Sequence, residues 1–213
     1  MEHVVLLGDS IFDNAAYVPG GTPVIDQLRQ TLPANWKATL LAIDGNVTDD
    51  VPSQAKKIPA DATHLVVSAG GNDALGESII LAEPAHTVGD ALIMLSHVRE
   101  AFAMAYRAML KSVLALGKPT IVCTIYDAVP GLGAAESVAL ACFNDVILRE
   151  AFSNDLSVID LRLVCDRAED YSEVSPIEPS MAGGARIARA IAEVVTMHDL
   201  SLRRSAICGK DRS

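Results

Sequence analysis

A serine follows the first apolar run of the chain, in a place where its hydroxyl could act as a nucleophile. The run 4–7 reads Val-Val-Leu-Leu, and Gly8, Asp9 and Ser10 come directly after it. A glycine at this point permits a tight turn, which would present the next side chains at the end of a buried strand. Because Asp and Ser also cap helices, Asp9 and Ser10 have a purely structural alternative. The pattern makes Ser10 a candidate nucleophile.

Hydrogen-bond donors follow two further apolar runs. Gly45 comes after the second run, and residues 70–73, Gly-Gly-Asn-Asp, come after the third. The backbone N–H of a glycine and the side-chain amide of Asn72 are both groups that can stabilise a developing negative charge. Each also has a structural alternative, because a glycine can simply form a turn and an asparagine can form an Asx-turn. These residues follow three successive predicted strands: a serine, a glycine and a Gly-Gly-Asn sequence. The three together are harder to explain by coincidence than any one of them.

Short β-branched runs alternate with longer segments of helical period, which is typical of a parallel sheet covered by helices on both faces. The predicted strands are 3–7, 38–43, 64–68, 120–124 and 157–159, and the predicted helices are 23–31, 50–55, 88–115, 134–152 and 182–196, the last capped by Ser180. In such a sheet the loops at the carboxyl ends of the strands meet along one edge, where ligands bind. The candidate residues all lie on that edge.

Composition narrows the classes of partner. The 213 residues are 50% apolar with a formal net charge of −10. This charge argues against nucleic acid and anionic membranes as partners, because these bind clustered Lys and Arg.

No apolar run reaches the about 18 residues of a membrane span, and no signal peptide is apparent, so we expect a cytoplasmic protein. The four widely spaced cysteines fit structural thiols. We expect one domain over 1–198 and a mobile tail over 199–213.

With these motifs the chain resembles the SGNH/GDSL hydrolases, over nearly its whole length. Residues 8–10 are similar to the first block of that family, Gly45 to the second and residues 70–73 to the third. The resemblance implies an α/β fold, a flavodoxin-like three-layer α/β/α sandwich whose five-stranded parallel sheet has the order 2-1-3-4-5. It also implies that Ser10 is the nucleophile and that the oxyanion hole is formed by the backbone N–H groups of Ser10 and Gly45 and the side chain of Asn72.

The same resemblance implies a small-molecule substrate, a carboxylic ester or thioester, and no cofactor. Asp9, Gly71 and Asp73 flank the motif residues and are expected to contact this substrate. A divalent metal on the same edge is a minor alternative, since several aspartates follow strands there. Neither the acyl group nor the leaving group follows from these motifs.

The chain departs from the family at the general base. The last family block reads Asp-x-x-His-Pro, whereas residues 175–179 read Ser-Pro-Ile-Glu-Pro, so that Glu178 replaces the histidine and Ser175 the aspartate. A carboxylate with an ordinary pKa of ~4.3 is a weak base, but burial could raise the pKa toward ~6–7. Of the five histidines, only His86 lies on the correct edge, and it reads more simply as a solvated loop residue.

Three functions stay open at this stage. The first is a serine-dependent hydrolase with Glu178 as its base, and the second is a binding protein that has lost the catalytic histidine. In the third, Glu178 accepts a proton in chemistry that forms no acyl-enzyme.

Overall fold

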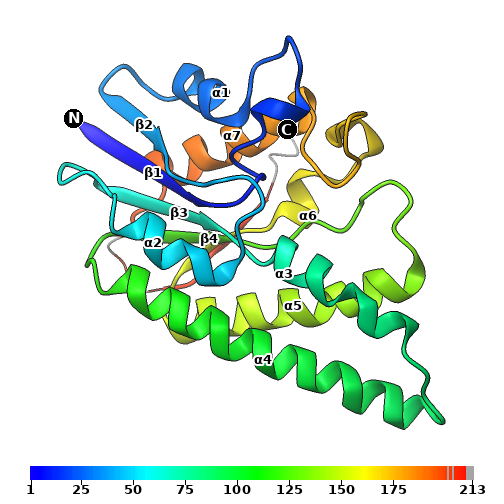
Figure 1. Ribbon diagram of the computed structural model, residues 1–213. Coiled ribbons are helices and arrows are strands. Elements are labelled where there is room, and N and C mark those ends of the chain that lie inside the picture. The colour runs from blue at the N-terminus through cyan, green and yellow to red at the C-terminus, as the bar shows by residue number, and fades with distance from the viewer. Residues whose placement is uncertain (201, 203, 210–213) are drawn as a thin grey trace.

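The sheet lies at the centre of the molecule in the computed structural model, which describes residues 1–200, 202 and 204–209 (Figure 1). Over these residues the sheet has six strands, all pairing in parallel, in the order β2-β1-β3-β4-β5-β6. The strands are β1 (Glu2–Gly8), β2 (Trp36–Leu40), β3 (His64–Ser68), β4 (Thr120–Cys123), β5 (Ser157–Ile159) and β6 (Ile207–Cys208). The predicted order 2-1-3-4-5 is confirmed, with β6 added beside β5.

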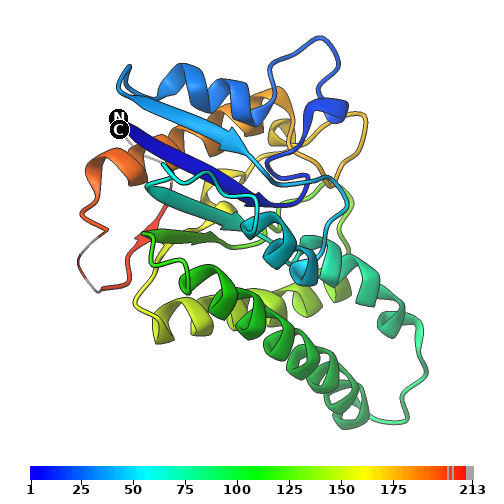
Figure 2. The ribbon, with the colours of Figure 1, turned by 60° about the vertical axis from the view of Figure 1, so that its left-hand side comes forward.

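Helices cover both faces of this sheet (Figures 1 and 2). One face carries α1 (Val24–Thr31), α6 (Leu161–Val164) and α7 (Met181–Met197), and the other carries α2 (Val51–Ala55), α4 (Val88–Leu114) and α5 (Ala134–Ser153). The segment after β3 forms α3 (Gly71–Gly76) and the 3-10 helix η3 (Glu77–Ala82). Three shorter 3-10 turns are η1 (Ala15–Tyr17), η2 (Thr48–Asp50) and η4 (Ala168–Asp170). The predicted three-layer α/β/α architecture is confirmed.

The alternation of side chains along β1 explains why both layers are needed. Val4 and Leu6 pack into the core beneath α1 and α7, whereas Val5 and Leu7 pack into the core beneath α4 and α5. All four are fully buried. A strand that is buried on both faces reads as a continuous apolar run, which is how the sequence marks it. The two cores share one sheet, which supports the proposed single domain over residues 1–198.

The bounds of the elements differ from the prediction at a few places. Strand β2 begins and ends earlier than the predicted 38–43, but the chain beyond it stays beside β1, because the N–H of Ile43 donates to the Gly8 carbonyl. The helices α3 and α6 and the turn η3 were not predicted. Ser180 does cap α7, since its hydroxyl accepts hydrogen bonds from the N–H groups of Ala182 and Gly183.

Part of the segment expected to be a mobile tail is a strand. Ile207 and Cys208 form β6 and pair in parallel with Val158 and Ile159 of β5. The prediction for residues 201, 203 and 210–213 lies outside the described residues. The tail therefore extends the sheet at its edge, which the loss of helical period after residue 199 did not indicate.

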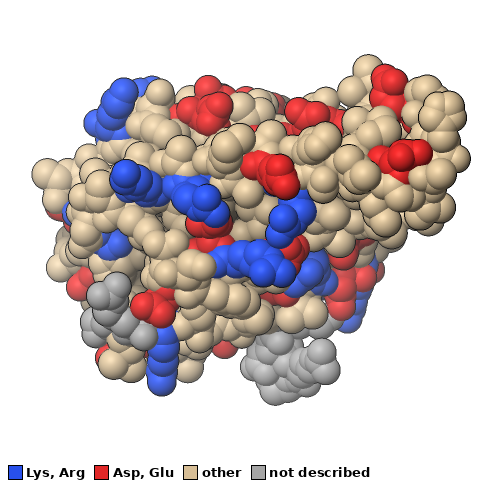
Figure 3. All heavy atoms as spheres, turned by 90° about the horizontal axis from the view of Figure 1, so that it is seen from below, with Lys and Arg blue, Asp and Glu red and all other residues tan. Residues whose placement is uncertain are grey.

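The outer face of α4 and α5 carries both signs of charge (Figure 3). Arg99 and Arg149 both pair with Asp145, and Arg107 pairs with Glu150 at 2.6 Å. Cations and carboxylates are thus interspersed on this face, and the Arg99–Asp145 and Arg107–Glu150 pairs join the two helices. Within the described residues, no helix is both long and apolar enough to cross a membrane.

The turn at Gly8 is the sharpest steric constraint on the edge that carries Ser10. Gly8 has a φ of +131°, and a Cβ atom there would lie 1.7 Å from the carbonyl oxygen of Ser68. Two backbones therefore touch where β1 and β3 end, and only glycine fits.

We expect Gly8→Ala to lower the free energy of unfolding by about 4 kcal/mol or more, because the clash is with backbone. Gly117→Ala is the matched control, since Gly117 also has a positive φ, +65°, but has no atom within 4 Å of the added Cβ. It should lose only about 1–2 kcal/mol. Urea unfolding measures both, and equal losses would contradict the steric role of Gly8.

Candidate active site

The Ser10 side chain lies at the carboxyl end of β1, on a short turn that Asp9 holds. A carboxylate oxygen of Asp9 accepts a hydrogen bond from the N–H of Ile11 at 3.1 Å, and the Asp9 carbonyl accepts from Phe12 and Asp13. The capping role is thus carried by Asp9. Ser10 is only 5% exposed, and its side chain lies close enough to the Glu178 carboxylate to lower the pKa of that group.

A cavity of about 160 Å³ opens beside Ser10, and several predicted site residues meet there. Asp9, Ser10, Gly71, Asn72 and Glu178 all line it. They come from the loop after β1, the start of α3 and the loop before α7, three segments that are far apart in the sequence. A hydroxyl, a carboxamide and two buried carboxyl groups therefore face one volume whose other walls are largely apolar.

Gly45 and Asp73 lie outside the lining of this cavity. Gly45 is exposed, with a φ of +79°. A carboxylate oxygen of Asp73 accepts hydrogen bonds from both the backbone N–H and the hydroxyl of Thr48, at 3.0 and 3.1 Å. Gly45 thus belongs to a loop that borders the site, and Asp73, a residue of α3, fastens this loop to the helix through Thr48. His86 is an exposed loop residue outside the lining, as its simpler interpretation predicts.

The side-chain amide of Asn72 is held by the loop that contains Gly45. One N–H of this amide donates to the carbonyl of Asn46 at 2.9 Å. The side chain of Asn46 in turn accepts a hydrogen bond from Gln54 at 2.8 Å. Gln54 also pairs with both backbone groups of Gly8, accepting from its N–H at 2.8 Å and donating to its carbonyl at 2.7 Å. Gln54, which is 2% exposed, therefore ties the turn before Ser10 to the support of Asn72.

The backbone on either side of Glu178 is held from several directions. The Tyr126 hydroxyl donates to the carbonyl of Ile177 at 2.6 Å, and the Asn14 amide donates to the carbonyl of Pro179 at 3.1 Å. The N–H of Ser172 donates to the carbonyl of Glu178 itself. These bonds fix the backbone that aims the Glu178 side chain at Ser10.

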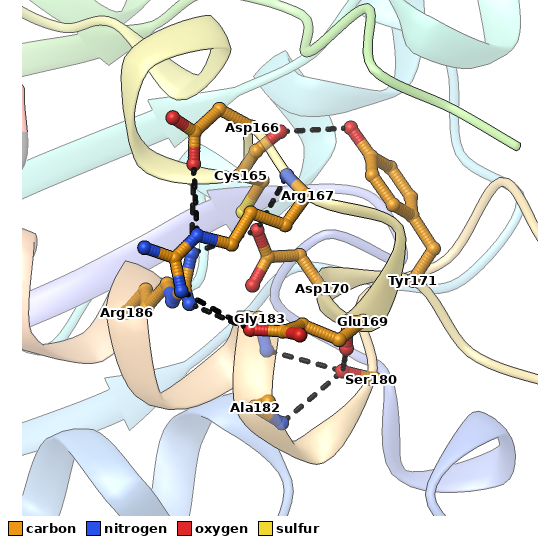
Figure 4. Close-up of polar contacts among 10 residues, drawn as sticks. All are labelled: Cys165, Asp166, Arg167, Glu169, Asp170, Tyr171, Ser180, Ala182, Gly183 and Arg186. Carbon is orange, nitrogen blue, oxygen red and sulfur yellow. Dashed lines mark hydrogen bonds and ion pairs between the residues drawn. The ribbon is translucent and has the colours of Figure 1, made fainter.

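The loop that carries Glu178 is closed at its base by a polar cluster (Figure 4). Tyr171 and Pro179 form an antiparallel bridge, and the Ser180 N–H donates to the carbonyl of Asp170. The fully buried carboxylate of Asp170 is paired with Arg186 at 3.0 Å. The Ser180 hydroxyl donates to the Glu169 carbonyl at 2.6 Å while it caps α7. The start of α7 and the base of this loop are thus one unit.

Burial changes the acidity of the two carboxyl groups in the cavity. Desolvation raises the pKa of Glu178 from 4.5 to about 7, although the nearby Ser10 side chain lowers it in part. Desolvation likewise raises the pKa of Asp9 to about 7, and the nearby charge of Glu178 adds to this increase. Within the described part of the chain, one carboxylate oxygen of Glu178 has no hydrogen-bond partner. Glu178 therefore has the acidity of a base that works near neutral pH.

Sequence reasoning missed the residues that position this site. Gln54, Asn14 and Tyr126 make the contacts that hold Gly8, Pro179 and Ile177, but none of the three lies in a motif block. Among the described residues, no group of three or more His, Cys, Asp or Glu side chains could hold a metal ion.

Comparisons with known proteins bear on this geometry. A family model described as the GDSL-like Lipase/Acylhydrolase family matches residues 6–186. A comparison with curated proteins finds no match.

Solved structures share the fold at low sequence identity. The extracellular lipase of Streptomyces rimosus is similar at a TM-score of 0.64 and 16% identity, over 92% of this chain and all (100%) of that one. The lipase Lip_vut3 from a goat rumen metagenome is similar at 0.73 and 15%, over 94% and 100%. The acetyl xylan esterase AlAXEase is similar at 0.65 and 16%, over 91% and 99%.

The buried Glu178 carboxylate should reduce stability at high pH. Because its pKa in the folded protein is raised from 4.5 to about 7, folding favours the protonated form. The free energy of unfolding then falls as pH rises from about 4.5 to about 7 and stays low above that. We expect Glu178→Gln to be about 1–3 kcal/mol more stable than wild type at pH 8, with a smaller difference at pH 5.

Urea unfolding at the two pH values checks this expectation. Glu173→Gln, an exposed carboxylate in the same loop, is the control and should change neither value. A Glu178→Gln protein that is less stable than wild type at pH 8 would contradict the burial of an ionised Glu178.

Proposed function

Because the chain belongs to the GDSL-like lipase/acylhydrolase family of hydrolytic enzymes, we propose that it cleaves carboxylic esters or thioesters through an acyl-enzyme on Ser10. In this proposal Glu178 accepts the proton of the Ser10 hydroxyl. The observation that carries the proposal is that Ser10 and Glu178, a buried residue whose carboxyl pKa is about 7, line the same cavity. A serine hydroxyl needs such a neighbour before it can attack.

The proposed first half-reaction forms the acyl-enzyme. Glu178 removes the proton as the Ser10 oxygen bonds to the carbonyl carbon of the substrate, and the carbonyl oxygen becomes an oxyanion. The backbone N–H of Ser10 and the second N–H of the Asn72 amide stabilise this charge. Protonated Glu178 then gives its proton to the leaving alcohol or thiol, and the bond to that group breaks.

The second half-reaction returns the enzyme to its starting state. Glu178 removes a proton from water as the water oxygen attacks the acyl carbon. A second oxyanion forms and collapses, the bond to Ser10 breaks, and the proton on Glu178 returns to the serine oxygen. A carboxylic acid leaves.

Gly45 contributes through its loop in this proposal. Because Gly45 lies outside the cavity lining, its neighbour Asn46 takes the supporting role by holding one N–H of the Asn72 amide. The Asp9 carboxyl group keeps the turn in place through Ile11 and adds to the local negative charge. The predicted cytoplasmic location also stays a prediction.

A ligand-binding protein without catalysis is the second candidate. It is favoured by the carboxylate at position 178, because an imidazole is the more effective base at neutral pH. The double change Glu178→His with Ser175→Asp separates the two functions. Turnover that appears only in the double variant would favour a natural binder.

Removal of the nucleophile gives the direct test. We expect Ser10→Ala to lower kcat/KM for short-chain p-nitrophenyl esters by about a thousandfold or more, whereas Ser53→Ala on the exposed side of α2 should match wild type. Wild-type kcat/KM should rise with pH and level off above about 7, because Glu178 must be ionised to act as the base. Equal rates in Ser10→Ala and wild type would reject the assignment.

Gln54 is expected to be a positioning residue. Gln54→Met keeps the size of the side chain but removes the partner of the Gly8 N–H and one of the two donors to the Gly8 carbonyl, which also accepts from Ile43. This should lower stability by about 1–3 kcal/mol. We also expect kcat to fall about tenfold or more with little change in KM, because the turn before Ser10 and the support of Asn72 both loosen.

The control for this variant is another buried glutamine. Gln27 donates to the carbonyls of Thr22 and Met181 and lies outside the cavity. Gln27→Met should lose similar stability and keep the wild-type kcat. If the two variants lose kcat equally, Gln54 acts only through global stability.

A further inference from the structure

The cavity beside Ser10 has a long apolar wall on the side away from β1. This wall is formed by side chains of α3, η3, α4 and α5. The ribbons of these four elements lie next to one another in Figure 2. Its main contributors are Leu75, Ile80, Leu95, Val98, Leu140 and Phe143. Because one water-sized site needs only about 10–15 Å³, a volume of about 160 Å³ exceeds what an acetyl group would fill.

All the charged residues that line the cavity are acidic. They are Asp9, Glu77, Glu136 and Glu178, and the lining within the described chain contains no Lys, Arg or His. Glu77 and Glu136 are exposed, so they lie where the cavity meets solvent. An anionic group approaching this opening meets carboxylates with no cation to receive it, on a protein whose formal net charge is −10.

We propose that the site takes esters that join an aliphatic acyl chain, clearly longer than acetyl, to an uncharged leaving group. The acyl chain lies against the wall of α3, η3, α4 and α5, and the leaving group faces the acidic opening. This inference rests on the proposed function and names its substrate class. It predicts that neutral lipid-like esters are better substrates than acetyl esters, and also better than phosphate-bearing thioesters.

Chain length gives the first test. For p-nitrophenyl esters from acetyl to octanoyl, kcat/KM should rise about threefold to fourfold for each methylene that leaves water, until the wall is covered. Leu95→Trp, which shortens the space along α4, should lower the octanoyl-to-acetyl ratio about tenfold. Leu92→Trp lies on the same helix, is 59% exposed and is outside the lining, so it should keep the wild-type ratio. A wild-type preference for acetyl would overturn the inference.

Charge gives the second test, with two thioesters that share one acyl group. Octanoyl-N-acetylcysteamine is uncharged, whereas octanoyl-coenzyme A carries phosphates. We expect kcat/KM to be about tenfold or more higher for the uncharged thioester at low salt, and the gap should narrow at about 0.5 M NaCl as charges are screened. Glu77→Gln combined with Glu136→Gln should narrow it as well, whereas Glu83→Gln, exposed and outside the lining, should not. Equal or better use of the coenzyme A thioester would overturn the inference.

Binding to Ser10→Ala separates this inference from the proposed function. Calorimetry with monooctanoylglycerol, monoacetylglycerol and octanoyl-coenzyme A should give measurable affinity for the first ligand alone, whether or not Ser10 is the nucleophile. If Ser10→Ala keeps full turnover but shows this preference, the proposed mechanism fails and the substrate class stands. If Ser10 is essential but the preference is absent, the mechanism stands and the substrate class fails.

Discussion

The end of β1 passes so close to the end of β3 that the backbone of Gly8 touches the carbonyl of Ser68. A side chain at Gly8 would overlap that oxygen, and Gln54 binds both backbone groups of Gly8 from the other side. The chain therefore leaves the sheet along one path, and this path fixes the position of Ser10. Because Gln54 also binds Asn46, which supports Asn72, the same contact locates both the hydroxyl and the amide donor.

Burial of the two carboxyl groups links stability to chemistry. Asp9 and Glu178 face a largely apolar cavity, and the loss of hydration raises the pKa of each to about 7. An ionised carboxylate in such a place destabilises the folded protein, yet only there does it become basic enough to take a proton from serine near neutral pH. The hydrogen bonds to the carbonyls of Ile177 and Pro179 fix the backbone on both sides of Glu178.

The loop that carries Glu178 departs from the family motif, yet several contacts fix its position. The antiparallel bridge between Tyr171 and Pro179 closes the loop formed by residues 171–179. The ion pair between Asp170 and Arg186 fastens the base of this loop to α7. The position of Glu178 thus depends on a polar cluster whose members lie outside the cavity lining. In the same way, the apolar wall formed by α4 and α5 depends on how these helices pack.

Whereas the order of the five main strands followed only from the resemblance to a family, sequence alone was sufficient for the two-sided burial of β1 and for the presence of Ser10, Asn72 and Glu178 at the carboxyl edge. These features are local, because apolar runs, turn glycines and motif spacing are written in neighbouring residues. Tertiary structure alone decided that Gly45 and Asp73 lie outside the cavity lining. It also decided that Gln54, Asn14 and Tyr126 hold the backbone around the site. Their partners lie tens of residues away or more, and no local pattern encodes a hydrogen bond between segments that meet only when the sheet is assembled.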